Sequence, residues 1–156
     1  MLSIKLLNMN NLFLKKLLML KSKLHRPFEI IVEGTSMQPI LYHGQIITVC
    51  WHDRYSVGDI LVFFYKNDAL LVHRLLKIQN GRYFCKGDNS FRLEDIGSEN
   101  IVGAVILEFD ANNTSEFIAD SYLISRIFQR NGYDIAKTKA SLEYMAYEKK
   151  HLRNET

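Results

Sequence analysis

The sequence contains few cysteines, few prolines and no long apolar run. Two cysteines in 156 residues, Cys50 and Cys85, are too few for a disulfide scaffold, and we interpret both as small buried side chains of strands. No stretch reaches the roughly 20 apolar residues of a membrane-spanning helix, because lysines flank the longest run, Leu17–Leu20. No close Cys/His spacing indicates zinc, so neither a metal nor a cofactor is expected.

The chain also has little excess of charge of either sign. A net charge of +3 does not indicate a nucleic-acid-binding protein, and no nucleic-acid partner is expected. Hydrophobic residues make up 47% and charged residues 24%, which is typical of a globular protein. The length fits one domain with appendages, and the composition changes divide it into residues 1–25, 26–110 and 111–156.

Residues 1–25 are predicted to form a basic amphipathic helix. Apolar side chains recur at three- or four-residue spacing among lysines, at Leu6, Met9, Phe13, Leu17 and Leu20. Three interpretations are open. The helix packs on its own domain, lies on a membrane surface, or borders a groove for a peptide substrate.

Residues 26–110 are predicted to form antiparallel β-structure built from hairpins. Asn80-Gly81 is a strong two-residue hairpin signal, and Lys66–Asp68 is a second turn signal. The expected strands cover 28–33, 45–51, 60–65, 69–78, 82–86 and 101–109, with a polar loop over 87–98.

The last part of the chain, residues 111–156, is predicted to be helical. A first amphipathic segment carries Ile118 to Phe128 and breaks at Asn131-Gly132. Asp134 can cap a second helix that continues through Ala146. The second helix lacks a concentrated basic face at its start, so the pair does not indicate a DNA-binding helix-turn-helix.

Ser36 lies in a turn that can present its hydroxyl group in a fixed position. The turn follows an apolar run and stands between Gly34, which tolerates unusual backbone angles, and Pro39, which fixes its own φ. Met37 and Leu41 can anchor the turn by apolar contacts. A hydroxyl group needs a nearby base to become a nucleophile.

Five short blocks downstream of residue 33 resemble one family in their residues and their order. They are Gly34-Thr35-Ser36-Met37-Gln38-Pro39, Val57-Gly58-Asp59-Ile60, His73-Arg74-Leu75, Lys86-Gly87-Asp88-Asn89 and Val102-Gly103. Together they resemble the type I signal peptidases, serine endopeptidases of the superfamily that includes LexA-like self-cleaving repressors. The resemblance covers roughly Phe28 to Leu107. It implies a curled, partly open β-barrel-like catalytic core, over residues 26–110, with a shallow groove for extended substrate.

The resemblance also implies the residues of a catalytic site. Ser36 matches the nucleophile, and His73 stands where the familiar bacterial enzymes have a lysine base, as in the archaeal and endoplasmic-reticulum branch. Histidine ionises near neutral pH, so it can accept a proton with little tuning. Asp95 best matches the acid that orients His73, Asp88 is the second choice with a structural loop role, and Glu94 is the third.

The oxyanion hole is expected to include the Ser36 backbone N–H. Some family members place a serine two residues before the nucleophile, where this chain has Gly34, so Thr35 or a backbone amide is the expected substitute.

The remaining polar residues near these motifs are given structural roles. We interpret His25, His43 and His52 as surface residues. Asp59 is expected to hold its turn, and Arg74 and Lys86 are expected to make structural ion pairs.

The sequence therefore predicts a serine endopeptidase that cleaves extended peptides, such as leader or signal peptides. Its expected partners are a peptide or preprotein substrate and a membrane surface, which residues 1–25 would contact peripherally. The expected location is the cytoplasm or the membrane surface. Two alternatives remain open. One is a non-catalytic peptide-binding module on the same fold, and the other is a self-cleaving regulator.

Overall fold

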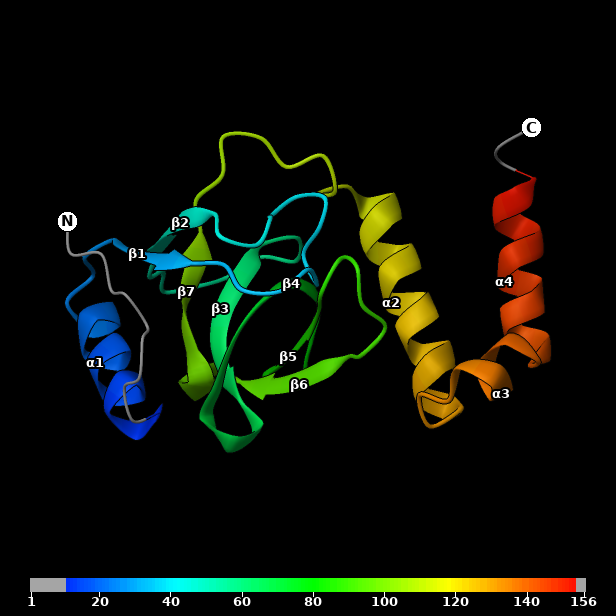
Figure 1. The fold of residues 1–156 in the computed structure, drawn as a ribbon, viewed down its shortest axis with the longest axis horizontal. Coiled ribbons are helices and arrows are strands. Elements are labelled where there is room, and N and C mark those ends of the chain that lie inside the picture. Colours follow the sequence, from blue (N-terminus) through cyan, green and yellow to red (C-terminus); the bar gives the residue numbers. More distant parts are fainter. Residues whose placement is uncertain (1–10, 154–156) are drawn as a thin grey trace.

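The computed structural model describes residues 11–153, which form one antiparallel sheet of seven strands with helices before and after it (Figure 1). The strands are β1 (Phe28–Ile31), β2 (Ile46–Cys50), β3 (Ile60–Tyr65), β4 (Ala69–Gln79), β5 (Arg82–Lys86), β6 (Glu94–Gly97) and β7 (Ile101–Val105). They are ordered β1-β2-β7-β3-β4-β5-β6 and curl into a half-barrel. The expected mainly β core with helices at both ends of the chain is confirmed.

The centre of the sheet is formed by β3, whose first five residues, Ile60 to Phe64, are all buried. A strand that is covered on both faces reads as a continuous run of β-branched and aromatic residues. The hairpin between β4 and β5 turns at Asn80 and Gly81, with φ values of 51° and 70°. Two successive positive φ values are what a two-residue type I′ turn requires, so this hairpin signal is confirmed.

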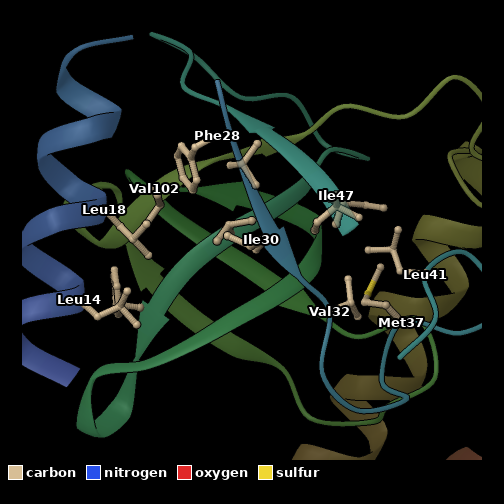
Figure 2. Close-up of a cluster of buried hydrophobic side chains, with 13 residues drawn as sticks. Leu14, Leu18, Phe28, Ile30, Val32, Met37, Leu41, Ile47 and Val102 are labelled. Carbon is tan, nitrogen blue, oxygen red and sulfur yellow. The ribbon is translucent and has the colours of Figure 1, made fainter. Parts of the chain in front are cut away.

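One apolar cluster connects the N-terminal helix, the sheet and the turn that carries Ser36. Figure 2 shows Leu14 and Leu18 of α1 (Asn11–Lys23) on the side of the helix that faces the sheet, near Val102. The same cluster continues to Met37 and Leu41, which are 2% and 0% exposed. Burying a side chain of this size stabilises the fold by about 1.5–3 kcal/mol, so the Ser36 turn is anchored on its apolar side.

The predicted N-terminal helix is observed over Asn11–Lys23, and its positions 1–10, with Leu6 and Met9, lie outside the described residues. Packing on its own domain is confirmed for the face with Leu14 and Leu18. None of the described helices is long and apolar enough to cross a membrane.

Three helices follow the sheet and lie at the opposite end of the molecule from α1 (Figure 1). They are α2 (Ser115–Arg130), α3 (Ile135–Lys139) and α4 (Leu142–Leu152). The predicted break after Arg130 and the Asp134 cap, which accepts from the Lys137 N–H, are both present. The expected second helix is divided in two, because the Ser141 side chain caps a new helix at the Tyr144 N–H.

Two predictions for the sheet are wrong by four residues or more, and the first strand, predicted over 28–33, ends two residues early at Ile31. The segment 87–98 was expected to be a polar loop, yet residues 94–97 form β6, which pairs with β5 through Cys85 and Glu94. Acidic residues such as Glu94 and Asp95 are uncommon in strands, so the local sequence does not indicate β6. The strand forms because it pairs with β5. The last strand, expected over 101–109, ends at Val105.

Candidate active site

Ser36 follows β1 in a tight turn whose backbone is closed by its own hydrogen bonds. Gly34 has a φ of +79°, which favours glycine. The N–H groups of Ile40 and Leu41 both donate to the Met37 carbonyl, at 3.0 and 2.9 Å. With the Met37 side chain buried below, the turn holds the Ser36 side chain at the end of β1.

His73 lies in the middle of β4, opposite Leu61 of β3, and is 7% exposed. Its Nε2 is 3.0 Å from Ser36 Oγ, although 37 residues separate the two along the chain. The structure therefore brings together the serine and the histidine that the motifs single out.

The carboxylate that contacts His73 belongs to Glu94, the third choice of the sequence. Glu94 Oε2 is 3.0 Å from His73 Nδ1, and the residue is 2% exposed. A carboxylate accepts hydrogen bonds, so in the tautomer with its proton on Nδ1 the ring donates to Glu94 and turns the Nε2 lone pair toward the Ser36 hydroxyl. Ser36, His73 and Glu94 are thus joined by two consecutive 3.0 Å contacts, an order of groups that can activate a hydroxyl nucleophile.

The preferred acid, Asp95, does not reach His73 and has to be replaced by Glu94 as the orienting group. Successive side chains of a strand point to opposite faces, and Asp95 in β6 is exposed while Glu94 is buried. Asp95 pairs instead with Arg82, with 2.7 Å between Oδ1 and Nε. Asp88, the second choice, has a structural role: it pairs with Arg74 at 2.8 Å.

The loop after β5 lies directly against the Ser36 turn. The Asn89 backbone N–H donates to the Ser36 carbonyl at 2.8 Å, and Asn89 Nδ2 donates to the Thr35 carbonyl at 3.2 Å. A Cβ atom on Gly87 would lie 2.6 Å from the Ser36 carbonyl oxygen and 3.0 Å from His73 Nε2. Position 87 therefore requires glycine because any side chain there would separate the serine from the histidine.

Arg74, the residue after His73, is fully buried between two carboxylates. Its guanidinium binds Asp88 and Asp110 through four hydrogen bonds of 2.7–2.9 Å and also donates to the Gly58 carbonyl. Burial alone would lower the pKa of Arg74, but the bonds to the two carboxylates raise it above its usual value. The expected ion pairing of Arg74 is confirmed, and Asn112 adds a 3.0 Å bond to Asp88.

Lys86 is 3% exposed and behaves differently from the expectation. No ion pair is found for it within residues 11–153; its Nζ donates to the carbonyls of Gly87 and Ser90, at 2.9 and 2.7 Å. Burial lowers the pKa of Lys86 to about 8, although the nearby carboxylates of Asp88 and Glu94 raise it. The lysine thus stabilises the loop that contacts Ser36, a role that its place at the end of a predicted strand did not reveal.

A groove of about 260 Å³ contains both Ser36 and His73. One wall is β1, which among the described strands pairs with β2 alone. The other wall is residues 69–73 of β4, which pair with β3 on one side and precede the part that pairs with β5. Both walls therefore leave backbone N–H and C=O groups available to an extended chain.

The backbone N–H of Ser36 has no acceptor in the described part of the chain, so it is available to an oxyanion. The neighbouring Gly34 N–H donates to His43 Nδ1 at 3.0 Å, so this exposed histidine braces the turn. Thr35, one of the two expected substitutes beside a backbone amide, is exposed next to Ser36.

The other residues named from the sequence have the following contacts. His25 stacks on Trp51 at 4.1 Å, and His52 meets Tyr55 edge-on. Asp59 accepts from the Ser56 N–H at 2.8 Å, which confirms its role in the turn. Cys85 is buried and Cys50 is partly buried, and both are free thiols. Over residues 11–153, no group of three or more His, Cys, Asp or Glu side chains is placed to hold a metal ion.

The combination of fold and site is a curled antiparallel sheet with a Ser–His–Glu arrangement in a groove between two open strand edges. No protein-family model matches the chain, and the comparison with curated proteins finds no match either. The likeness to type I signal peptidases therefore depends on the five motifs alone.

Proposed function

We propose that the protein is a serine endopeptidase of the signal-peptidase type that cleaves extended peptides, such as leader or signal peptides. Ser36 is the nucleophile, His73 the general base, and Glu94 the acid that orients His73. The observation that carries the proposal is the pair of 3.0 Å contacts that connect Ser36 Oγ through His73 to Glu94.

The proposed reaction begins when Ser36 Oγ attacks the carbonyl carbon of the scissile peptide bond while His73 Nε2 takes the hydroxyl proton. The oxyanion of the tetrahedral intermediate accepts a hydrogen bond from the Ser36 N–H. The C–N bond then breaks, and the amine leaves with the proton from His73. Water, deprotonated by His73, hydrolyses the acyl-enzyme and restores Ser36.

The groove supports an extended substrate. A peptide that enters between β1 and residues 69–73 of β4 can add to the sheet as a further strand. Backbone hydrogen bonds to an open edge provide affinity without regard to sequence, and the pockets for alternate side chains provide specificity. Such binding aligns a scissile carbonyl with Ser36 at the end of the groove.

The proposal is tested by chemical labelling of the nucleophile. Wild-type protein, Ser36→Ala and His73→Gln are treated with a fluorophosphonate probe, and intact-mass spectrometry measures the adduct. We expect one adduct on the wild type, located on Ser36, no adduct on Ser36→Ala and at least 100-fold slower labelling of His73→Gln. Ser98→Ala, at an exposed serine of the turn before β7, is the matched control and should label like the wild type.

Cleavage of a peptide library by the same variants gives the second measurement. Cleavage by the wild type and its loss in Ser36→Ala support the peptidase. A wild type that neither labels nor cleaves would favour the non-catalytic peptide-binding module, which needs the groove but not the hydroxyl.

A further inference from the structure

The groove extends well beyond the catalytic pair and reaches the N-terminal helix. Its lining runs from Ser36 and His73 along β4 to Ala69, where Leu14 of α1 contributes to the same cavity. Leu14 is 7% exposed, because most of its surface packs in the apolar cluster with Leu18 and Val102 (Figure 2). One apolar edge of α1 is thus part of the groove.

An ion pair also links α1 to this end of the groove. Lys15 Nζ is 2.7 Å from Asp68 Oδ1, in the turn that begins β4, and 5.6 Å from the centre of the Phe64 ring. Asp68 also lines the groove, so Lys15 neutralises a carboxylate that would otherwise face a bound peptide. The far end of the groove is therefore an apolar site with compensated charge.

The register of β4 gives the distance of this site from the cleavage point. Ala69 precedes His73 by four residues, and a strand advances about 3.3 Å per residue, so the two ends are about 13 Å apart. Leu70 and Val72 pack against the same apolar cluster as Leu14. A substrate strand beside β4 would place a side chain about four residues from the scissile bond against Leu14 and Leu70.

We propose that α1 completes a distal subsite, with Leu14 as its specificity-determining residue, that selects peptides with a large apolar side chain about four residues from the scissile bond. This inference depends on the proposed peptidase function. The subsite is unfavourable for acidic side chains, because a carboxylate would lose its water against the apolar wall while Lys15 is already paired with Asp68.

The subsite is tested with peptides that share one scissile bond and carry Leu, Ala or Asp at each position from two to six residues on either side of it. For the wild type we expect kcat/KM to be roughly tenfold or more higher for Leu than for Ala at one position three to five residues away. Asp at that position should give the lowest value. The side of the bond on which the preference appears gives the direction of the substrate strand.

Three variants connect the preference to α1. Leu14→Phe, which enlarges the wall and reduces the space, should lower the Leu/Ala ratio at that position at least fivefold. Lys15→Ala, which removes the ion pair to Asp68, should lower the ratio as well. Lys16→Ala is the matched control, since Lys16 is an exposed lysine of the same helix and does not line the groove, and it should leave the ratio unchanged. Thermal melting confirms that each variant is folded.

The subsite and the peptidase fail in different ways. Cleavage without a preference at positions three to five, or a preference that a folded Leu14→Phe retains, overturns the subsite and leaves the peptidase intact. If no peptide is cleaved, the peptidase fails, and binding of fluorescent Leu and Ala peptides to Ser36→Ala decides the subsite. Tighter binding of the Leu peptide that Leu14→Phe abolishes supports the inference, and equal binding overturns it.

Discussion

Replacing Glu94 by Gln isolates the part of the site that the geometry assigns to the buried carboxylate. The two side chains have the same shape, so the space between β6 and His73 stays filled. The amide NH₂ can donate to His73 Nδ1, which then carries the lone pair, and the ring proton moves to Nε2. A protonated Nε2 faces Ser36 Oγ as a donor and cannot take its proton. The expected result is a correctly folded protein with an inactive tautomer.

The size of the effect follows from the 3.0 Å contact between Glu94 and His73. In the transition state of the proposed reaction the ring would become an imidazolium, with its charge centre about 4 Å from that of the carboxylate. At an effective dielectric constant of about 20, two unit charges at that distance attract by about 4 kcal/mol. Since about 1.4 kcal/mol corresponds to a factor of ten in rate, kcat should fall by about 10³.

The neighbouring residue provides the matched control. Asp95→Asn removes the same charge one position further along β6, but its ion pair with Arg82 is half exposed, with side-chain exposures of 54% and 46%. Exposed pairs contribute about 0–1 kcal/mol, so stability should change little and kcat should stay within about twofold. Both variants are assayed on one cleavable peptide and by thermal melting. A Glu94→Gln protein that is as active as the wild type, or an Asp95→Asn protein that is inactive, would refute the reasoning.

Three further predictions concern the loop, its buried lysine and the outer face of α1. Gly87→Ala should lower kcat more than 100-fold while the protein stays folded, because the methyl group pushes the Ser36 turn away from the base. Gly81→Ala is the control: its methyl group meets no atom within 4 Å, so the variant should keep its activity, although the positive φ of the hairpin turn lowers its stability. An active Gly87→Ala would contradict the geometry. The pKa of Lys86 is about 8 in the folded protein and 10.5 in the unfolded chain. Between these values the unfolded chain binds more protons than the folded protein, so the free energy of unfolding should rise with pH there. Urea unfolding at pH 7.5, 9 and 10 should show this rise for the wild type relative to Lys86→Met, and parallel curves would count against it. The α1 side chains Phe13 and Leu20, 58% and 56% exposed beside lysines, should bind anionic phosphatidylglycerol vesicles in flotation assays. The double variant Phe13→Ser/Leu20→Ser should bind these vesicles more than tenfold less than the wild type. A wild type that floats only with neutral vesicles, or a double variant that floats as well as the wild type, would argue against a membrane contact.

The sequence predicts the sheet well where local chemistry decides it. A run of β-branched and aromatic residues favours a buried strand, and Asn-Gly favours a type I′ turn. The local sequence therefore specifies both β3 and the turn at Asn80-Gly81, and both are confirmed. The pairing of Ser36 with His73 was expected only from the resemblance of their two motifs, and the structure places Oγ and Nε2 3.0 Å apart.

The third member of the site could not be chosen from spacing. Glu94 and Asp95 are chemically similar neighbours, and the difference between them comes from the strand in which they lie. Once β6 is recognised, alternation places Glu94 on the same face as the buried Ile96 and Asp95 on the other. The strand is short and begins with two acidic residues, so its formation depends on pairing with β5, which is a long-range property.

Lys86 and Gly87 show a different limit of sequence patterns. The motif predicts that this block matters, but not that the ammonium would bind the Gly87 and Ser90 carbonyls or that the glycine would fill the space beside Ser36. Both facts depend on how closely the loop approaches the turn, which only three-dimensional packing determines.

The cation of Arg74 is shared by the loop that supports Ser36 and by the first residues after the sheet, through Asp88 and Asp110. Leaving a fully buried guanidinium with one of its two counterions would cost several kcal/mol. The path of the chain at residues 110–112 is thereby linked, through Arg74, to the loop that contacts Ser36. We expect α2, α3 and α4 to tolerate extensive substitution on their outer faces, while the short link that joins them to the sheet tolerates very little.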